Sequence, residues 1–207
     1  MKYKNKNKNK NKLTIIVSRE AGSGGKLIAQ KVAKRLSLQF YDQKLIDLIA
    51  KSANKRKEIL QKLDEKERSL LDDMVKSLLD PEYLSENTFI LKLATTIAAL
   101  GKKGNAVILG RGANFILPAE CTLRIRIIAP YLTRVYYTQK YEKRTKADAE
   151  KRVKRFDKDR KEFVRQYFGK NPSSSNYYDL VFNTKILQLD DIVDTIVLAA
   201  RQRMMQA

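Results

Sequence analysis

Leu13 to Leu27, LTIIVSREAGSGGKL, is the stretch that decides the fold. Apolar residues run unbroken from Leu13 to Val17, glycines gather in Gly22-Ser23-Gly24-Gly25, and an amphipathic helical pattern begins at Lys26. This order predicts a strand, a tight loop and a helix. Glycines allow positive φ angles in such a loop, and the helix N-terminus adds its N–H groups and the positive end of its dipole. The stretch therefore predicts a phosphate-binding loop.

The loop departs from the full P-loop pattern, G-x-x-x-x-G-K-[ST]. With Gly24 as the second glycine, Arg19 stands at the first, Gly25 at the lysine and Lys26 at the serine or threonine. The alternative is a glycine-rich turn that only packs a helix on a sheet. A dinucleotide-binding fingerprint is disfavoured, because the G-x-G-x-x-G spacing is absent.

Composition limits the location and the chemistry of the protein. A chain of 207 residues, 43% of them hydrophobic, can form one core, and no apolar run approaches the roughly 20 residues of a membrane span. No secretory signal is visible, and the single cysteine, Cys121, fits a reducing cytoplasm. We expect a cytoplasmic protein in which Cys121 is a buried apolar side chain.

The chain contains no histidine. This excludes Ser-His-Asp and Cys-His catalysis as well as His-ligated metals. Phosphoryl transfer remains, because it depends on positioning and charge neutralisation rather than on a base tuned near neutral pH.

The charge of the chain favours acidic partners. A net charge of +20 and a pI near 10.0 are typical of proteins that bind nucleotides, nucleic acid or an anionic surface. Residues 1–12, MKYKNKNKNKNK, have too little apolar content to fold and predict a disordered tail that can bind nucleic acid without sequence specificity.

Beyond the first loop, apolar runs alternate with helical patterns. Further strands are expected over residues 38–41, 106–109, 123–129 and 180–182, and helices over 26–36, 45–49, 85–100, 131–168 and 189–205. Residues 51–80 read as a charged helical excursion. The alternation predicts an α/β fold with about five parallel strands, helices on both faces, and ligands at the carboxyl ends of the strands.

Five stretches, in this order, resemble the cytidylate kinase-like family, a branch of the P-loop nucleoside monophosphate kinases. They are VSREAGSGG (17–25), FYD (40–42), VILGRGA (107–113), DKDR (157–160) and YDLVFNT (178–184). The resemblance implies a P-loop NTPase-type three-layer sandwich, formed by residues 13–207 as one domain. It also implies a helical acceptor-side insertion over 51–104, a basic helical lid over 131–170, and ATP-dependent transfer, with Mg²⁺, to a nucleoside monophosphate such as CMP or dCMP.

The same resemblance assigns the donor side of the site. Gly22, Ser23, Gly24 and Gly25 would wrap the β-phosphate of ATP with backbone N–H groups. Arg19 or Lys26 would supply the charge of the missing lysine. Ser23 is the loop hydroxyl that would reach Mg²⁺.

Arginines and aspartates carry the acceptor side and the lid in this resemblance. Arg111 corresponds to the arginine that holds the acceptor phosphate; the alternative is a solvent-facing arginine in a turn. Arg160, together with Arg155 and Arg152 on the same helix, corresponds to the lid arginines that neutralise the transferred group, although basic helices are more often solvated faces. Asp157 would orient the acceptor or pair with Arg160.

Asp42 follows a short strand, where a carboxylate can bind Mg²⁺ through water, fix the acceptor sugar, or cap the next helix. Gly112 stands where ordinary cytidylate kinases carry an aspartate, so the contact that selects cytosine is missing.

Two hypotheses follow for the function of the protein. The protein is an ATP-dependent kinase of a small phosphorylated acceptor, or it is a catalytically weak or inactive nucleotide- or RNA-binding protein on the same fold.

Overall fold

The computed structural model describes residues 13–61, 69, 73, 75, 77 and 88–206. Its centre is a sheet of five parallel strands in the order β2-β3-β1-β4-β5. The strands are β1 (Thr14–Arg19), β2 (Gln39–Tyr41), β3 (Ala106–Leu109), β4 (Thr122–Ile128) and β5 (Leu180–Asn183). The predicted α/β class and the parallel sheet are confirmed.

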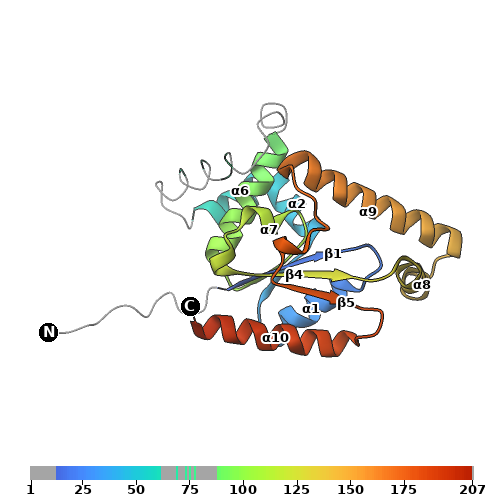
Figure 1. Cartoon of the computed structure of the whole chain (residues 1–207). Helices are drawn as coiled ribbons and strands as arrows, with labels where there is room; N and C mark the ends of the chain where they lie inside the picture. Colours follow the sequence, from blue (N-terminus) through green and yellow to red (C-terminus); the bar gives the residue numbers. More distant parts are fainter. Residues whose placement is uncertain are drawn as a thin grey trace.

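Helices cover both faces of this sheet, which makes three layers (Figure 1). On one face lie α1 (Gly25–Arg35) and α10 (Leu189–Gln206); on the other lie α2 (Gln43–Lys51), α3 (Ala53–Leu60), α6 (Thr88–Lys103) and the short α7 (Ala113–Ile116). The helices α8 (Tyr131–Glu142) and α9 (Lys146–Phe168) lie beyond the carboxyl ends of the strands, and α9 runs back across them toward α7.

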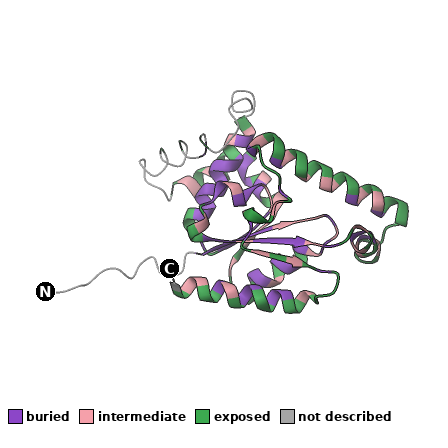
Figure 2. Ribbon diagram, in the orientation of Figure 1, coloured by how far each residue is buried: buried purple, intermediate pink, exposed green. Residues whose placement is uncertain are grey.

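The core has two halves, one on each face of the sheet. Ile15 and Val17 pack with residues of α1 and α10, whereas Ile16 between them packs with residues of α6 and α9. A strand buried on both faces requires an unbroken apolar run, which explains the pattern from Leu13 to Val17. Figure 2 shows buried residues along the strands and on the inner sides of the helices.

The prediction of one helix over residues 131–168 is wrong. The first helix, α8, ends at Lys143, whose φ of 52° is left-handed. The second, α9, starts after Thr145, whose hydroxyl accepts a hydrogen bond from the Asp148 N–H at 3.2 Å. The helical and basic pattern continues through this corner, so it hid the break; the Thr145 cap was the available signal.

Cys121 is exposed, not buried as expected, because it lies in a short 3-10 turn before β4. Within the described part of the chain, no helix is both long and apolar enough to cross a membrane. The predicted tail, residues 1–12, and half of the predicted excursion over 51–80 lie outside the described residues, so the nucleic-acid role of the tail stays a prediction.

Candidate active site

Two cavities lie at the carboxyl ends of the strands. The loop cavity, of about 430 Å³, is bordered by residues 22–27, by α8 and by the segment after β5. The strand-end cavity, of about 270 Å³, lies between the ends of β1, β3 and β4 and helix α9. Three residues border both cavities: Arg19, Glu20 and Arg160. A ligand in one cavity would therefore meet a ligand in the other at these side chains.

The glycine loop fits closely against its neighbours. Gly22 and Gly24 have φ angles of 76° and 80°. A methyl group on Gly22 would place its carbon 2.5 Å from the carbonyl oxygen of Arg134, and one on Gly25 would lie 2.6 Å from the Cβ of Arg19. No side chain caps the N-terminus of α1. Its free N–H groups lie at the loop cavity, an arrangement that suits phosphate.

Ser23 holds the loop to the sheet. Its side chain is fully buried, and its hydroxyl donates to the carbonyl oxygens of Glu20 at 2.9 Å and Ile127 at 3.2 Å. The structure therefore gives this hydroxyl a structural use, and it does not support the predicted role of Ser23 toward Mg²⁺. Among the residues that the structure describes, no group of three or more cysteine, aspartate or glutamate side chains could hold a metal ion.

Arg19 ends β1 and reaches the junction of the two cavities. Its guanidinium lies against Gly110, where a methyl carbon would come within 1.9 Å of Nη1. In the described chain this guanidinium has neither a hydrogen bond nor an ion pair. Burial, and then the charges of Arg160 and Arg111, lower its pKa to about 9, although Asp42 opposes the shift. A bound anion would stabilise the charged form of a buried guanidinium whose pKa is lowered in this way.

Lys26 lies near the loop but is already paired. Its Nζ is 2.9 Å from Oδ2 of Asp42, while Oδ1 of Asp42 accepts from the Leu45 N–H at 3.0 Å and caps α2. Burial raises the pKa of Asp42, but the bonds from Lys26 and Leu45 outweigh it, so that the pKa is lowered overall. The capping alternative for Asp42 is confirmed. Of the two candidates for the missing lysine, Arg19 borders both cavities and Lys26 only the loop cavity.

Arg111 occupies an unusual turn. Gly110, Arg111 and Gly112 are all left-handed, with φ angles of 79°, 57° and 67°. This conformation costs a residue with a side chain about 1–2 kcal/mol, so surrounding contacts must fix it. Here Arg111 pairs with Asp47, and its guanidinium lies 5.2 Å from the centre of the Phe163 ring. The Arg111 side chain is only 18% exposed and borders the strand-end cavity, unlike a solvent-facing turn residue.

The three predicted lid arginines take different places. Arg160 borders both cavities and donates to the carbonyl oxygen of Arg19 at 3.3 Å. Burial lowers the pKa of Arg160, Asp157 opposes the shift, and neighbouring arginines add to it. Arg152 borders the loop cavity and pairs with Glu142. Arg155 is exposed and borders neither cavity, so the structure does not bring it to the site.

Asp157 connects α9 to the loop. Its carboxylate accepts from the Ala21 N–H at 2.8 Å and pairs with Arg134 of α8, rather than with Arg160. Arg134 is buried and also donates to the carbonyl oxygens of Ala129, at 2.9 Å, and Ala21, at 3.1 Å. Arg134 and Glu20 were not predicted from the sequence. Glu20 lies in the first motif, next to Arg19, which was the only signal for it.

A parallel sheet of this strand order, a glycine loop between β1 and α1, and arginines over the strand ends define a P-loop kinase fold. The model of the cytidylate kinase-like family matches residues 14–186, so the chain belongs to that family, and the resemblance is confirmed. A comparison with curated proteins finds no match.

Solved structures are similar to this chain along most of its length. An uncharacterized protein from Eubacterium ventriosum is 24% identical, with 93% of this chain and 99% of that chain covered and a TM-score of 0.73. A shikimate kinase from Acinetobacter baumannii, in complex with shikimate, is 14% identical, with 91% and 93% covered and a TM-score of 0.48. A shikimate kinase from Bacteroides thetaiotaomicron is 12% identical, with 91% and 98% covered and a TM-score of 0.47.

Proposed function

We propose that this protein transfers a phosphoryl group from ATP to a small phosphorylated acceptor, for which its family points to a nucleoside monophosphate such as CMP or dCMP. One observation carries the proposal: two separate cavities meet at Arg19 and Arg160, and neither guanidinium has an anionic partner within hydrogen-bonding distance among the described residues. A reaction between two bound phosphates requires this arrangement, because the phosphoryl group passes in line from donor to acceptor.

The donor would lie in the loop cavity. The N–H groups at the start of α1 would bind its phosphates, and the apolar and aromatic side chains of Tyr137, Tyr141, Leu187 and Leu189 border the space for its base. Arg152 borders this cavity too. Its guanidinium would add positive charge beside the donor.

The acceptor would lie in the strand-end cavity, with its phosphate on Arg111. Charge spreads over the transferred group in the transition state, and fixed cations stabilise it because they need no reorganisation. Arg19 would act from the strand side and Arg160 from the lid side. The bond of Asp157 to the loop would hold α9 over the reacting groups and exclude water.

Mg²⁺ neutralises phosphate charge in this kind of transfer. It binds through one or two carboxylates together with phosphate oxygens and water, so the absence of a carboxylate cluster among the described residues is compatible with its use. Glu20, which borders both cavities, and Asp42, whose charge acts on Arg19, are two carboxylates close to the junction. The donor phosphates would provide most of the ligands.

Nucleotide binding without transfer is the second candidate. The displaced lysine and the buried Ser23 hydroxyl favour it, because both remove groups of the full P-loop pattern. The position of Arg19 opposes it, since this residue returns a cation to the junction.

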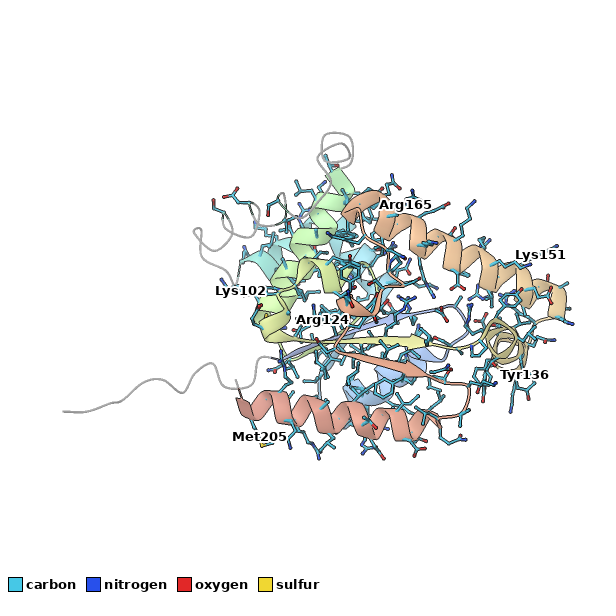
Figure 3. The ribbon with its side chains drawn as sticks, viewed as in Figure 1. Lys102, Arg124, Tyr136, Lys151, Arg165 and Met205 are labelled. Atoms are coloured by element: carbon cyan, nitrogen blue, oxygen red, sulfur yellow. The ribbon has the colours of Figure 1, made fainter. Side chains whose placement is uncertain are left out.

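The test is ATP consumption, with Mg²⁺, in the presence of CMP, dCMP, UMP, AMP or GMP. We compare wild type with Arg160→Ala and with Arg165→Ala, a matched control on the exposed side of the same helix (Figure 3). We expect turnover with at least one acceptor, a loss of about a hundredfold in Arg160→Ala, or roughly 2.7 kcal/mol, and a change within about twofold in the control. ATP binding without turnover for all acceptors would favour the second candidate, and equal loss in both variants would contradict the role of Arg160.

A further inference from the structure

The strand-end cavity contains a buried arginine that the proposed transfer does not use. Arg126, on β4, is 8% exposed and borders this cavity. Its Nη1 donates to the hydroxyl of Ser18 at 3.0 Å and to that of Tyr178 at 3.4 Å, and its guanidinium lies 5.4 Å from the centre of the Tyr178 ring. Ser18 and Tyr178 belong to the first and last family-like motifs. Both motifs therefore converge on Arg126.

Among the described residues, Arg126 has no full counterion. Its Nη2 is 4.0 Å from Oε1 of Glu20, beyond hydrogen-bonding distance. The other oxygen of that carboxylate already accepts from the Ala129 N–H at 3.1 Å and lies 3.4 Å from Nε of Arg134. A buried cation with unsatisfied N–H groups is unfavourable in the free protein.

Arg124, a second arginine of β4, has the complete ion pair that Arg126 lacks. Arg124 bonds Asp179 through Nη2 at 2.7 Å and Nε at 3.3 Å, and these bonds raise its pKa. It does not border the strand-end cavity. One strand therefore carries one arginine with a complete ion pair and one whose remaining donors lie at a cavity.

The neighbouring side chains lack acceptors too. Asn114 is 9% exposed, and its Nδ2 is buried without a hydrogen-bond partner. The same holds for Nε of Arg111 and Nε of Arg160, and all three residues border the strand-end cavity. Each of these atoms is an N–H donor, so acceptors on a ligand would complement this part of the lining.

We infer that Arg126 and Asn114 form a second anion subsite in this cavity, and that the acceptor carries a carboxylate in addition to the group held by Arg111. The inference rests on the proposed function, because it takes the strand-end cavity as the acceptor site. It narrows the acceptor to small phosphorylated compounds with two anionic groups, which CMP and dCMP do not have. The cavity volume of about 270 Å³ suits such a compound.

The test compares matched probes that differ in one group. 3-Phosphoglycerate and glycerol 3-phosphate share a phosphate and a three-carbon chain, and the first has a carboxylate where the second has a hydroxymethyl group; 5-phosphoribonate and ribitol 5-phosphate form a longer pair. Binding to the full chain is measured by calorimetry without ATP. In at least one pair, wild type is expected to bind the acid about tenfold more tightly than its neutral-ended partner.

Three variants assign this preference to the subsite. Arg126→Gln keeps a polar partner for Ser18 and Tyr178 and is expected to abolish the preference, whereas Arg126→Lys retains part of it. Arg124→Gln removes the same charge from the same strand and is expected to leave the preference intact (Figure 3). Thermal unfolding of each variant shows that it is folded, and the wild-type comparison stands even where a variant does not fold.

Equal affinity within both pairs, no binding of either acid, or the same loss in Arg124→Gln would overturn the inference. Its failure is distinct from that of the proposed function. Phosphoryl transfer to CMP without a preference for the acids contradicts the subsite alone. Tighter binding of the acids without any phosphoryl transfer from ATP contradicts the proposed kinase function alone.

Discussion

Arg19 is the residue on which the site depends. In the full P-loop pattern a lysine at the start of the helix neutralises the donor phosphates, and here Gly25 holds that place. Arg19 brings a cation to the same junction from the end of the preceding strand. Its planar fork can bind two phosphate oxygens in a fixed geometry, whereas a lysine acts as a point charge.

Replacement of Arg19 by methionine is expected to separate activity from stability. Arg19→Met keeps most of the aliphatic volume and removes a buried cation without a partner. We expect kcat to fall by about a hundredfold and the melting temperature to stay level or to rise. Coupled kinetics and thermal unfolding measure both. A melting temperature that falls together with the activity would show that Arg19 is mainly structural.

Asp42 is expected to stabilise the fold in a pH-dependent way. Asp42→Ala removes the cap of α2 and the partner of Lys26, at a cost of about 1 kcal/mol in the free energy of unfolding at neutral pH. Because folding lowers the pKa of Asp42 below its ordinary value of 3.8, its stabilisation is complete above that value and is lost as the pH falls through the folded pKa. The free energies of unfolding of wild type and Asp42→Ala, measured in urea, should therefore converge at low pH.

The control for Asp42 is Ser52→Ala, which removes the cap of α3. A serine hydroxyl does not titrate in this range, so its contribution should not change between neutral and acidic pH. The same pH dependence in both variants would contradict the electrostatic account of Asp42.

At the scale of elements, the left-handed turn after β3 positions two arginines together. Gly110 gives room to the guanidinium of Arg19, and Gly112 gives room to the Phe168 ring, which lies 2.4 Å from the place of a methyl carbon. Between them Arg111 is directed toward the strand-end cavity. The turn therefore links Arg111, the proposed acceptor arginine, to Arg19 at the junction and to the end of α9.

Two glycine variants test this link. Gly110→Ala and Gly169→Ala both place a methyl group on a left-handed residue, at a cost of about 1 kcal/mol each. Only at Gly110 would this group meet Arg19, since nothing lies within 4 Å of the corresponding position at Gly169. We expect similar losses in melting temperature but a fall of about a hundredfold in kcat for Gly110→Ala alone. Comparable kcat values in both variants would contradict the positioning of Arg19 by this turn.

At the scale of the whole molecule, the strand, loop and helix of residues 13–35 and the parallel sheet were predictable because they depend on local patterns: apolar runs, glycines and helical spacing. The corner at Thr145 was not, since the periodicity of the flanking helices runs through it. Arg126 and Arg134 were missed for another reason. A basic residue among apolar ones is normally solvated, and only tertiary contacts place these two inside.

The candidate site, too, was predictable where it depends on local motifs and not where it depends on tertiary contacts. Sequence motifs pointed to Arg19, Arg111 and Arg160, which the fold brings to the two cavities. The resemblance placed Arg155 with them, but Arg155 is exposed and borders neither cavity. The contact of Arg19 with Gly110 joins β1 to β3 and depends on the order of the strands, which no local pattern specifies.

We propose that a phosphoryl group passes between the two cavities, across Arg19 and Arg160. The decisive measurement follows the labelled γ-phosphate of ATP in the presence of Mg²⁺ and an acceptor panel that includes nucleoside monophosphates and small phosphorylated acids. We expect label in an organic product, dependent on the acceptor, and lost in Arg160→Ala. Label released only as inorganic phosphate, at a rate that no acceptor changes, would contradict it.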